Sequence, residues 1–144
     1  MAQFEITGLD ELVRSFNSVG NIADSVKKNA LEAMGDVAAK KIRQTGLEMN
    51  VFDNESDAHV LDSIKIAKPK LTKAGGTLDI NFSGTRTKDG KRTRNAEIAF
   101  VNEYGKTNQA ARPFIGRAMT ENADQINAAG AEKIGNWIEN EFKK

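Results

Sequence analysis

The spacing of apolar and polar residues predicts a chain that alternates between helices and strands. Apolar residues recur at helical spacing through residues 22–45 and predict one long N-terminal helix. Asn21 is expected to cap its start, and the helix is expected to end between Gly46 and Asn50. The stripe is rich in alanine, which favours close packing, and its members are Ile22, Val26, Ala30, Met34, Val37, Ala38 and Ile42.

Other segments show shorter patterns. A short strand is predicted over residues 4–7, followed by a short amphipathic helix over residues 9–16. Strict alternation predicts three further strands over residues 63–68, 77–83 and 94–100. The last of these would place three apolar side chains inward, those of Ala96, Ile98 and Phe100. Strands that are apolar on one face make an antiparallel meander, which needs a helix to cover it.

The turn between the last two of these strands, residues 84–94, is long and basic. Asp89-Gly90 is typical of a two-residue hairpin turn, and its flanks can pair as a ribbon with no apolar face. Such a ribbon is expected to project into solvent or into a partner. Five basic residues against Asp89 give it a net charge of +4, and they are Arg86, Lys88, Lys91, Arg92 and Arg94.

Three interpretations of this basic ribbon stay open at this point. It could be a solvated hairpin, a contact with a neighbouring subunit, or a contact with phosphate. The ribbon contains no aromatic residue on which a base could stack. Any contact with nucleic acid would therefore be electrostatic and independent of sequence.

The stretch 99–115 forms a corner, where the strand pattern gives way to a helix pattern. Pro113 fits the first turn of a helix, because its missing N–H is not needed there. Arg112 is a poor N-cap, so this helix start needs help from elsewhere. A rough apolar stripe then continues to Phe142 and predicts a C-terminal helix, in which Gly130 indicates a close contact between helices.

Length and composition narrow the class of protein. A chain of 144 residues is most simply one domain, residues 1–144, and the patterns predict an α+β fold. In that fold a long N-terminal helix and a C-terminal helix pack on a three- to four-stranded antiparallel sheet, from which the basic hairpin projects. No apolar run is long enough to span a membrane, and the N-terminus does not resemble a signal peptide.

The chemistry available to the chain is limited. There is no Cys and a single His, which excludes thiolate sites and a His-rich metal site. The acidic segment 51–62 is expected to be a solvated loop. It fails as a calcium loop, because Ala58 stands where Gly is needed and Ile64 where Glu is needed. No phosphate-binding loop or nucleophile motif is present, so we expect no enzyme, no cofactor and no metal.

Charge is unevenly distributed along the chain. Residues 1–62 carry 6 basic and 11 acidic side chains, which gives −5. Residues 63–117 carry 12 against 4, which gives +8, and residues 118–144 carry 3 against 5, which gives −2. Such asymmetry indicates contact with nucleic acid, or contact between copies of the chain in which plus meets minus.

Several motifs resemble one known family, the tail-component family of tailed bacteriophages. Residues 99–107, followed by 111–115 and Ala118, resemble its "fvEfGt … a.PFl..A" motif. Residues 6–12 resemble its "i.Gld.l" opening, and residues 60–64 resemble its "G.Lr.SI" entry to the sheet. The order and spacing of these motifs span nearly the whole chain.

The resemblance implies a structural role. Members of this family join head to tail, or complete the tail, in long-tailed phages and prophages. The resemblance implies a small α+β fold without catalysis, and a ring of identical subunits, expected to be a hexamer. The implied partners are further copies of the chain and neck, tail-terminator or tail-tube proteins, with passive contact to DNA in a basic lumen. The implied location is the tail or neck of the virion, and the bacterial host cytoplasm during assembly.

Two sets of residues are singled out for these roles. The structural set is expected to hold the sheet and the last helix together, and comprises Phe100, Tyr104, Gly105, Pro113 and Phe114. The set expected to contact neighbouring subunits or partners comprises the five basic ribbon residues with Glu103, Lys106 and Arg112. The alternative function is a non-specific nucleic-acid-binding module that uses the basic hairpin 84–94.

Overall fold

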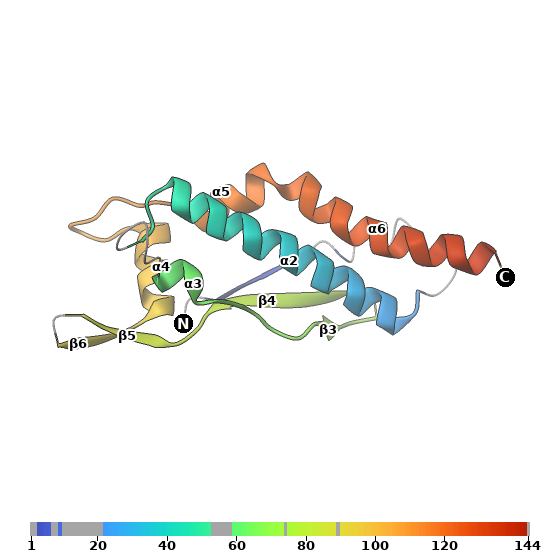
Figure 1. The fold of residues 1–144 in the computed structure, drawn as a ribbon, viewed down its shortest axis with the longest axis horizontal. Helices are drawn as coiled ribbons and strands as arrows, with labels where there is room; N and C mark the ends of the chain where they lie inside the picture. Colours follow the sequence, from blue (N-terminus) through green and yellow to red (C-terminus); the bar gives the residue numbers. More distant parts are fainter. Residues whose placement is uncertain are drawn as a thin grey trace.

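The computed structural model describes residues 3–6, 9, 22–52, 59–73, 75–88 and 90–143. It is a mixed fold in which a long helix, α2 (Asp24–Glu48), lies between a small sheet and two C-terminal helices (Figure 1). These are α5 (Phe114–Glu121) and α6 (Ala123–Phe142). The long N-terminal helix, the C-terminal helices and the antiparallel sheet confirm the predicted fold class.

The sheet is built around its longest strand, β4 (Gly76–Phe82). Three shorter strands pair with β4 in antiparallel fashion, and they are β1 (Gln3–Ile6), β2 (Ile64–Ile66) and β3 (Lys70–Leu71). The order is β1-β4-β2, with β3 also beside β4. Alternation in β4 turns Leu78, Ile80 and Phe82 toward α2, where all three are buried.

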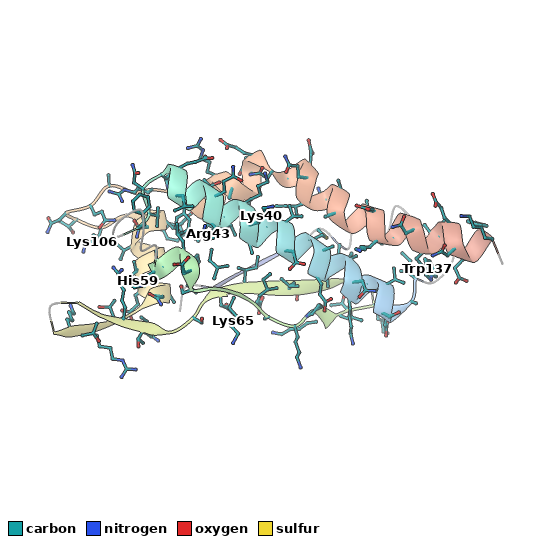
Figure 2. The ribbon with its side chains drawn as sticks, viewed as in Figure 1. Lys40, Arg43, His59, Lys65, Lys106 and Trp137 are labelled. Atoms are coloured by element: carbon teal, nitrogen blue, oxygen red, sulfur yellow. The ribbon has the colours of Figure 1, made fainter. Side chains whose placement is uncertain are left out.

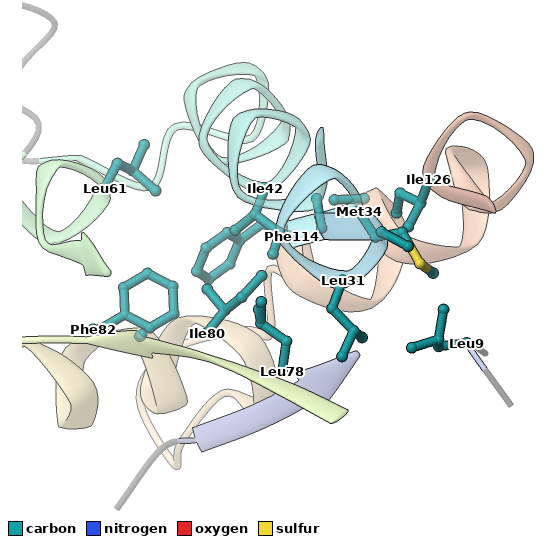
Figure 3. Close-up of a cluster of buried hydrophobic side chains, with 14 of the residues drawn as sticks. Leu9, Leu31, Met34, Ile42, Leu61, Leu78, Ile80, Phe82, Phe114 and Ile126 are labelled. Carbon is teal, nitrogen blue, oxygen red and sulfur yellow. The ribbon is translucent and has the colours of Figure 1, made fainter. Parts of the chain in front are cut away.

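The core fills the space between β4 and the helices (Figure 3). Leu31, Met34 and Ile42 of α2 are fully buried in it. Phe114, the first residue of α5, is also fully buried, and its ring meets that of Phe82 edge-on at 5.9 Å between centroids. This aromatic pair joins the end of β4 to the start of α5, and such a pair contributes about 0.5–1.5 kcal/mol beyond the area it buries.

Small residues bring α2 close to its neighbours. Ala30 and Ala38 are fully buried, and a Cβ on Gly35 would meet the Leu78 side chain at 2.9 Å. Gly130 of α6 is buried as well, and α6 packs along α2. The helix ends at Glu48, and Asn50 follows in the left-handed region with φ 61°.

The prediction of a strand over residues 94–100 is wrong. Residues Asn95–Tyr104 form a helix, α4, in which Ala96 and Ala99 are buried and Phe100 is exposed. The same stretch also has apolar residues at the i, i+3 and i+4 spacing of a helix, at Ala96, Ala99 and Phe100, and alanine and glutamate favour the helix. In place of residues 94–100, the N-terminal strand β1 pairs with β4 in the sheet.

The basic hairpin forms as predicted. Among the described strands, β5 (Thr85–Lys88) and β6 (Lys91–Arg94) pair only with each other, in a separate two-stranded sheet. The ribbon extends away from the main sheet at one end of the molecule (Figure 1). Its register pairs Lys88 with Lys91 across the turn, and Gly90 has φ 76°, as the turn requires.

Other predictions differ in detail or cannot be placed. The C-terminal helix is interrupted at Asn122, whose side-chain amide donates to the Ala118 carbonyl at 2.8 Å. Residues 59–62 form a short helix, α3 (His59–Asp62), and the expected turn 70–76 begins with β3. The Asn21 cap, most of the helix over 9–16 and most of the acidic loop lie outside the described residues.

A substitution at Gly76 tests how closely β3, β4 and α2 pack against one another. A Cβ there would lie 2.6 Å from the Lys70 carbonyl oxygen and 2.9 Å from a Leu31 methyl group. Because backbone cannot move aside cheaply, Gly76→Ala should lower the free energy of unfolding by about 1–3 kcal/mol, measured by urea denaturation.

Gly135→Ala is the matched control. Among the described residues nothing lies within 4 Å of a Cβ at Gly135, which is in the middle of α6. This substitution should raise the free energy of unfolding by up to about 1 kcal/mol. Equal effects of the two substitutions would contradict the packing described for Gly76.

Candidate interaction site

A groove at the ribbon end of the molecule brings together basic side chains from separate parts of the chain. Its volume is about 510 Å³. Four cationic residues line it, and they are Arg86 of β5, Lys91 of β6, Lys106 and Arg112. The remaining lining residues are Phe52, Val60, Thr93, Glu97, Ile98, Val101, Asn102 and Gln109. We call this site the basic groove.

Strand alternation decides which ribbon residues reach the basic groove. Arg86 pairs with Thr93 in the register, so both side chains lie on one face of the ribbon, and both line the groove. Lys91 lies two residues before Thr93 on β6, so it is on the same face of the ribbon, and it also lines the groove. Thus the ribbon presents one of its two faces to the groove.

Two of the predicted ribbon residues lie on the other face and do not join the groove. The Arg92 Nε donates to the Thr85 hydroxyl at 3.0 Å. Arg94 donates through Nε and Nη2 to one Glu97 carboxylate oxygen, at 3.0 and 2.8 Å. The sequence cannot distinguish them from Arg86 or Lys91, because all are basic residues in one hairpin.

The loop between α4 and α5 positions the other two cations. Lys106 and Gln109 exchange backbone hydrogen bonds of 2.9 and 3.0 Å, which close this loop on itself. The buried Asn102 accepts from the Gln109 side chain at 3.3 Å, and its carbonyl accepts from the Arg112 backbone N–H. The Arg112 Nη1 donates to the Asn50 carbonyl at 2.9 Å, so this residue also ties the loop to the end of α2.

Glu103 supplies the help that the start of α5 was expected to need. Its two carboxylate oxygens accept from the backbone N–H groups of Ile115 at 2.8 Å and Gly116 at 2.9 Å. Pro113, at the N-cap position, makes no side-chain cap. A carboxylate at a helix N-terminus satisfies otherwise unpaired donors and interacts favourably with the helix dipole. Glu103 therefore has a structural role inside the subunit, which its assignment to the contact set missed.

Gly105 is required by the geometry of the corner. It ends α4 with φ 77°, a conformation that residues with a Cβ rarely adopt. A Cβ there would also lie 2.9 Å from both the Ala111 amide nitrogen and the Gln109 carbonyl oxygen. Its placement among the structural residues therefore agrees with the geometry.

The aromatic members of the structural set divide into two kinds. Phe114 is fully buried, as expected. Phe100 and Tyr104 are 52% and 69% exposed, so the expectation that they hold the sheet to the last helix is wrong. They lie one turn apart on α4, with ring centroids 4.8 Å apart, on a helix whose buried face is Ala96 and Ala99. Because residues 95–104 form a helix and not a strand, Phe100 and Tyr104 lie on the exposed face of that helix.

The chemistry of the basic groove is that of an anion-binding surface with an apolar part. Phe52, Ile98 and Val101 are half-buried and give it apolar contact area. Among the described lining residues Glu97 is the one acidic side chain, and Arg94 pairs with it. The described residues contain no group of three or more His, Asp or Glu that could hold a metal. The groove therefore suits a ligand with both carboxylate or phosphate oxygens and an apolar group.

The apolar part of the groove was not found from the sequence. Ile98 and Val101 stand at i, i+3 spacing, which is the signal of a helix face. The prediction of a strand over residues 94–100 placed Ile98 in the core instead. Phe52 and Val60 reach the groove from a distant part of the chain, which no local pattern reveals.

Comparisons with family models, with curated proteins and with solved structures gave no match. In the described part of the chain, no helix combines the length and the apolar character needed to cross a membrane. The geometry of the site and the sequence motifs therefore carry the functional argument.

The capping role of Glu103 can be tested by stability. Glu103→Ala should lower the free energy of unfolding by about 1–2 kcal/mol, because two backbone donors of α5 lose their acceptor. Glu103→Gln keeps one acceptor oxygen and should lose about half as much. Urea denaturation of the purified variants measures both.

Glu97→Ala is the matched control on the same helix. Its carboxylate pairs with Arg94 at an exposed position, so its loss should cost at most about 1 kcal/mol. A Glu103→Ala variant as stable as Glu97→Ala would rule out the cap as a stabilising contact.

Proposed function

We propose that this protein is a structural component of a tailed phage or prophage, which joins head to tail or completes the tail. It acts by associating with copies of itself in a ring and by contacting neck or tail proteins. The observation that carries the proposal is the corner at residues 99–115, in which the motif residues Glu103, Gly105 and Phe114 have defined structural tasks.

The motif residues that resemble the phage family are those on which the corner depends. Glu103 caps α5, and Gly105 adopts a left-handed conformation where a Cβ would clash. Phe114 and Ala118 are fully buried in the first turns of α5. Proteins that fold into the same corner need these residue types at the same positions. The structural tasks of these residues therefore support the resemblance at the level of the fold.

The distribution of charge supports self-association. A ring of identical subunits uses a heterologous contact, in which two different faces of each subunit meet. The basic groove and the basic ribbon lie at one end of the molecule, and the first 62 residues have a net charge of −5. Opposite net charge on separate segments of one chain is compatible with such a contact between copies.

A second candidate function is a non-specific nucleic-acid-binding module. The convergence of Arg86, Lys91, Lys106 and Arg112 favours it, because clustered cations attract phosphates. The groove also has an apolar part, which a phosphate backbone does not use. We therefore rank nucleic-acid binding second.

Removal of the gene from the phage tests the first function. Without the protein we expect filled heads and separate tails, seen by electron microscopy, in place of joined virions. Supplying the wild-type chain should restore joining. Supplying Lys91→Glu/Lys106→Glu should not, because both substitutions reverse charge in the basic groove.

Lys65→Glu is the control, since Lys65 is exposed on β2 and does not line the groove. It should restore joining as well as the wild type. Normal virions in the absence of the gene would refute the proposal. The nucleic-acid alternative predicts instead that the pure protein binds DNA, with an affinity that falls steeply between about 50 and 200 mM salt.

A further inference from the structure

We propose that the basic groove of one subunit binds the C-terminal end of α6 from a second copy of the chain. This inference rests on the proposed function, because it names the contact through which the subunits associate. The occupant would place the carboxylate of Glu139 among the groove cations and the ring of Phe142 on the apolar part.

The groove needs an occupant with both kinds of group. Lys91 and Lys106 are exposed, and no acidic side chain among the described residues forms an ion pair with either. Ile98 and Val101 leave apolar surface beside them, on the face of α4 that turns toward the groove. A segment with a carboxylate and an adjacent aromatic ring satisfies both requirements.

The end of α6 offers this combination. Trp137 and Ile138 are the last residues of α6 that pack against the core, and the helix continues to Phe142. Glu139 is exposed, and Phe142 is 75% exposed, the most exposed large hydrophobic residue described. Glu132 stands two turns before Glu139 on the same exposed face, and Lys143 stands one turn after Glu139.

A subunit cannot fill its own groove in this way. The ribbon, Lys106 and α4 lie at one end of the long axis, and Trp137 and the C-terminus lie at the other (Figures 1 and 2). The contact must therefore join different copies, with the basic end of one against the α6 end of the next. Repetition of a head-to-tail contact produces a ring when the rotation closes.

The dimensions favour side chains over a nucleic-acid duplex. A volume of about 510 Å³ is within the range of pockets that bury a small ligand, and it accepts a few side chains. The apolar lining would face the phosphate backbone of a duplex without benefit. We therefore infer a protein segment as occupant, and nucleic acid is one outcome that the test can reveal.

Site-directed cross-linking tests the contact directly, because the chain contains no Cys. Lys106→Cys is prepared in one batch of full-length chain and Glu139→Cys in another, and the two are mixed with a short bismaleimide. We expect a cross-linked pair of chains between the two batches, identified by mass spectrometry. Its yield should be several-fold higher than that of the control mixture of Lys65→Cys with Glu139→Cys.

Charge reversal provides an independent measurement. Lys106→Glu should weaken self-association about tenfold in sedimentation experiments, and addition of Glu139→Lys to that variant should restore it. Lys65→Glu should change nothing. A cross-linking yield equal to the control, or unchanged association of Lys106→Glu, would overturn the inference.

The outcomes separate this inference from the proposed function. Self-association through another surface, with normal joining of heads and tails by Lys106→Glu, overturns the inference alone. Cross-linking as expected in a phage that assembles without the gene overturns the function alone. Binding of duplex DNA that is lost in Lys106→Glu, without the α6 cross-link, identifies nucleic acid as the occupant and overturns the inference.

Discussion

The close approach of α2 to β4 is the constraint on which the rest of the structure depends. A side chain at Gly35 would meet Leu78, and the buried alanines at positions 30 and 38 keep the helix narrow. Because α2 lies this close to β4, its apolar residues contact the sheet on one side of the helix and α5 and α6 on the other side. Leu31, Met34 and Ile42 are then removed from water completely, and burying such a side chain contributes about 1.5–3 kcal/mol.

The corner between α4 and α5 links the buried core to the basic groove on the surface. Phe114 anchors α5 against β4, and Glu103 holds its first turn to the end of α4. Asn102 fixes the intervening loop, so Lys106 and Arg112 come to face the ribbon. The basic groove is therefore a consequence of how the corner is held.

Part of the fold and part of the basic groove could be predicted from the sequence. The helix α2 was predictable because its apolar period continues over many turns, and the ribbon because Asp89-Gly90 defines a hairpin. Residues 95–104 were not, since the apolar residues at positions 96, 98 and 100 fit a strand, while those at positions 96, 99 and 100 fit a helix. The site follows the same division: Arg86, Lys91, Lys106 and Arg112 were singled out by charge, but charge alone also selected Arg92 and Arg94.

The sequence by itself determined the properties that depend on neighbouring residues. These are the long helix, the strand β4, the projecting hairpin, the uneven charge and the need of α5 for an outside cap. Only the tertiary structure decided which residue supplies that cap, that β1 completes the sheet, and which cations meet in one groove. These features join residues far apart in the chain, or they depend on which face of a strand or helix is turned inward. Local propensity does not encode either of them, because packing and hydrogen-bond satisfaction across the whole fold select among locally equivalent choices.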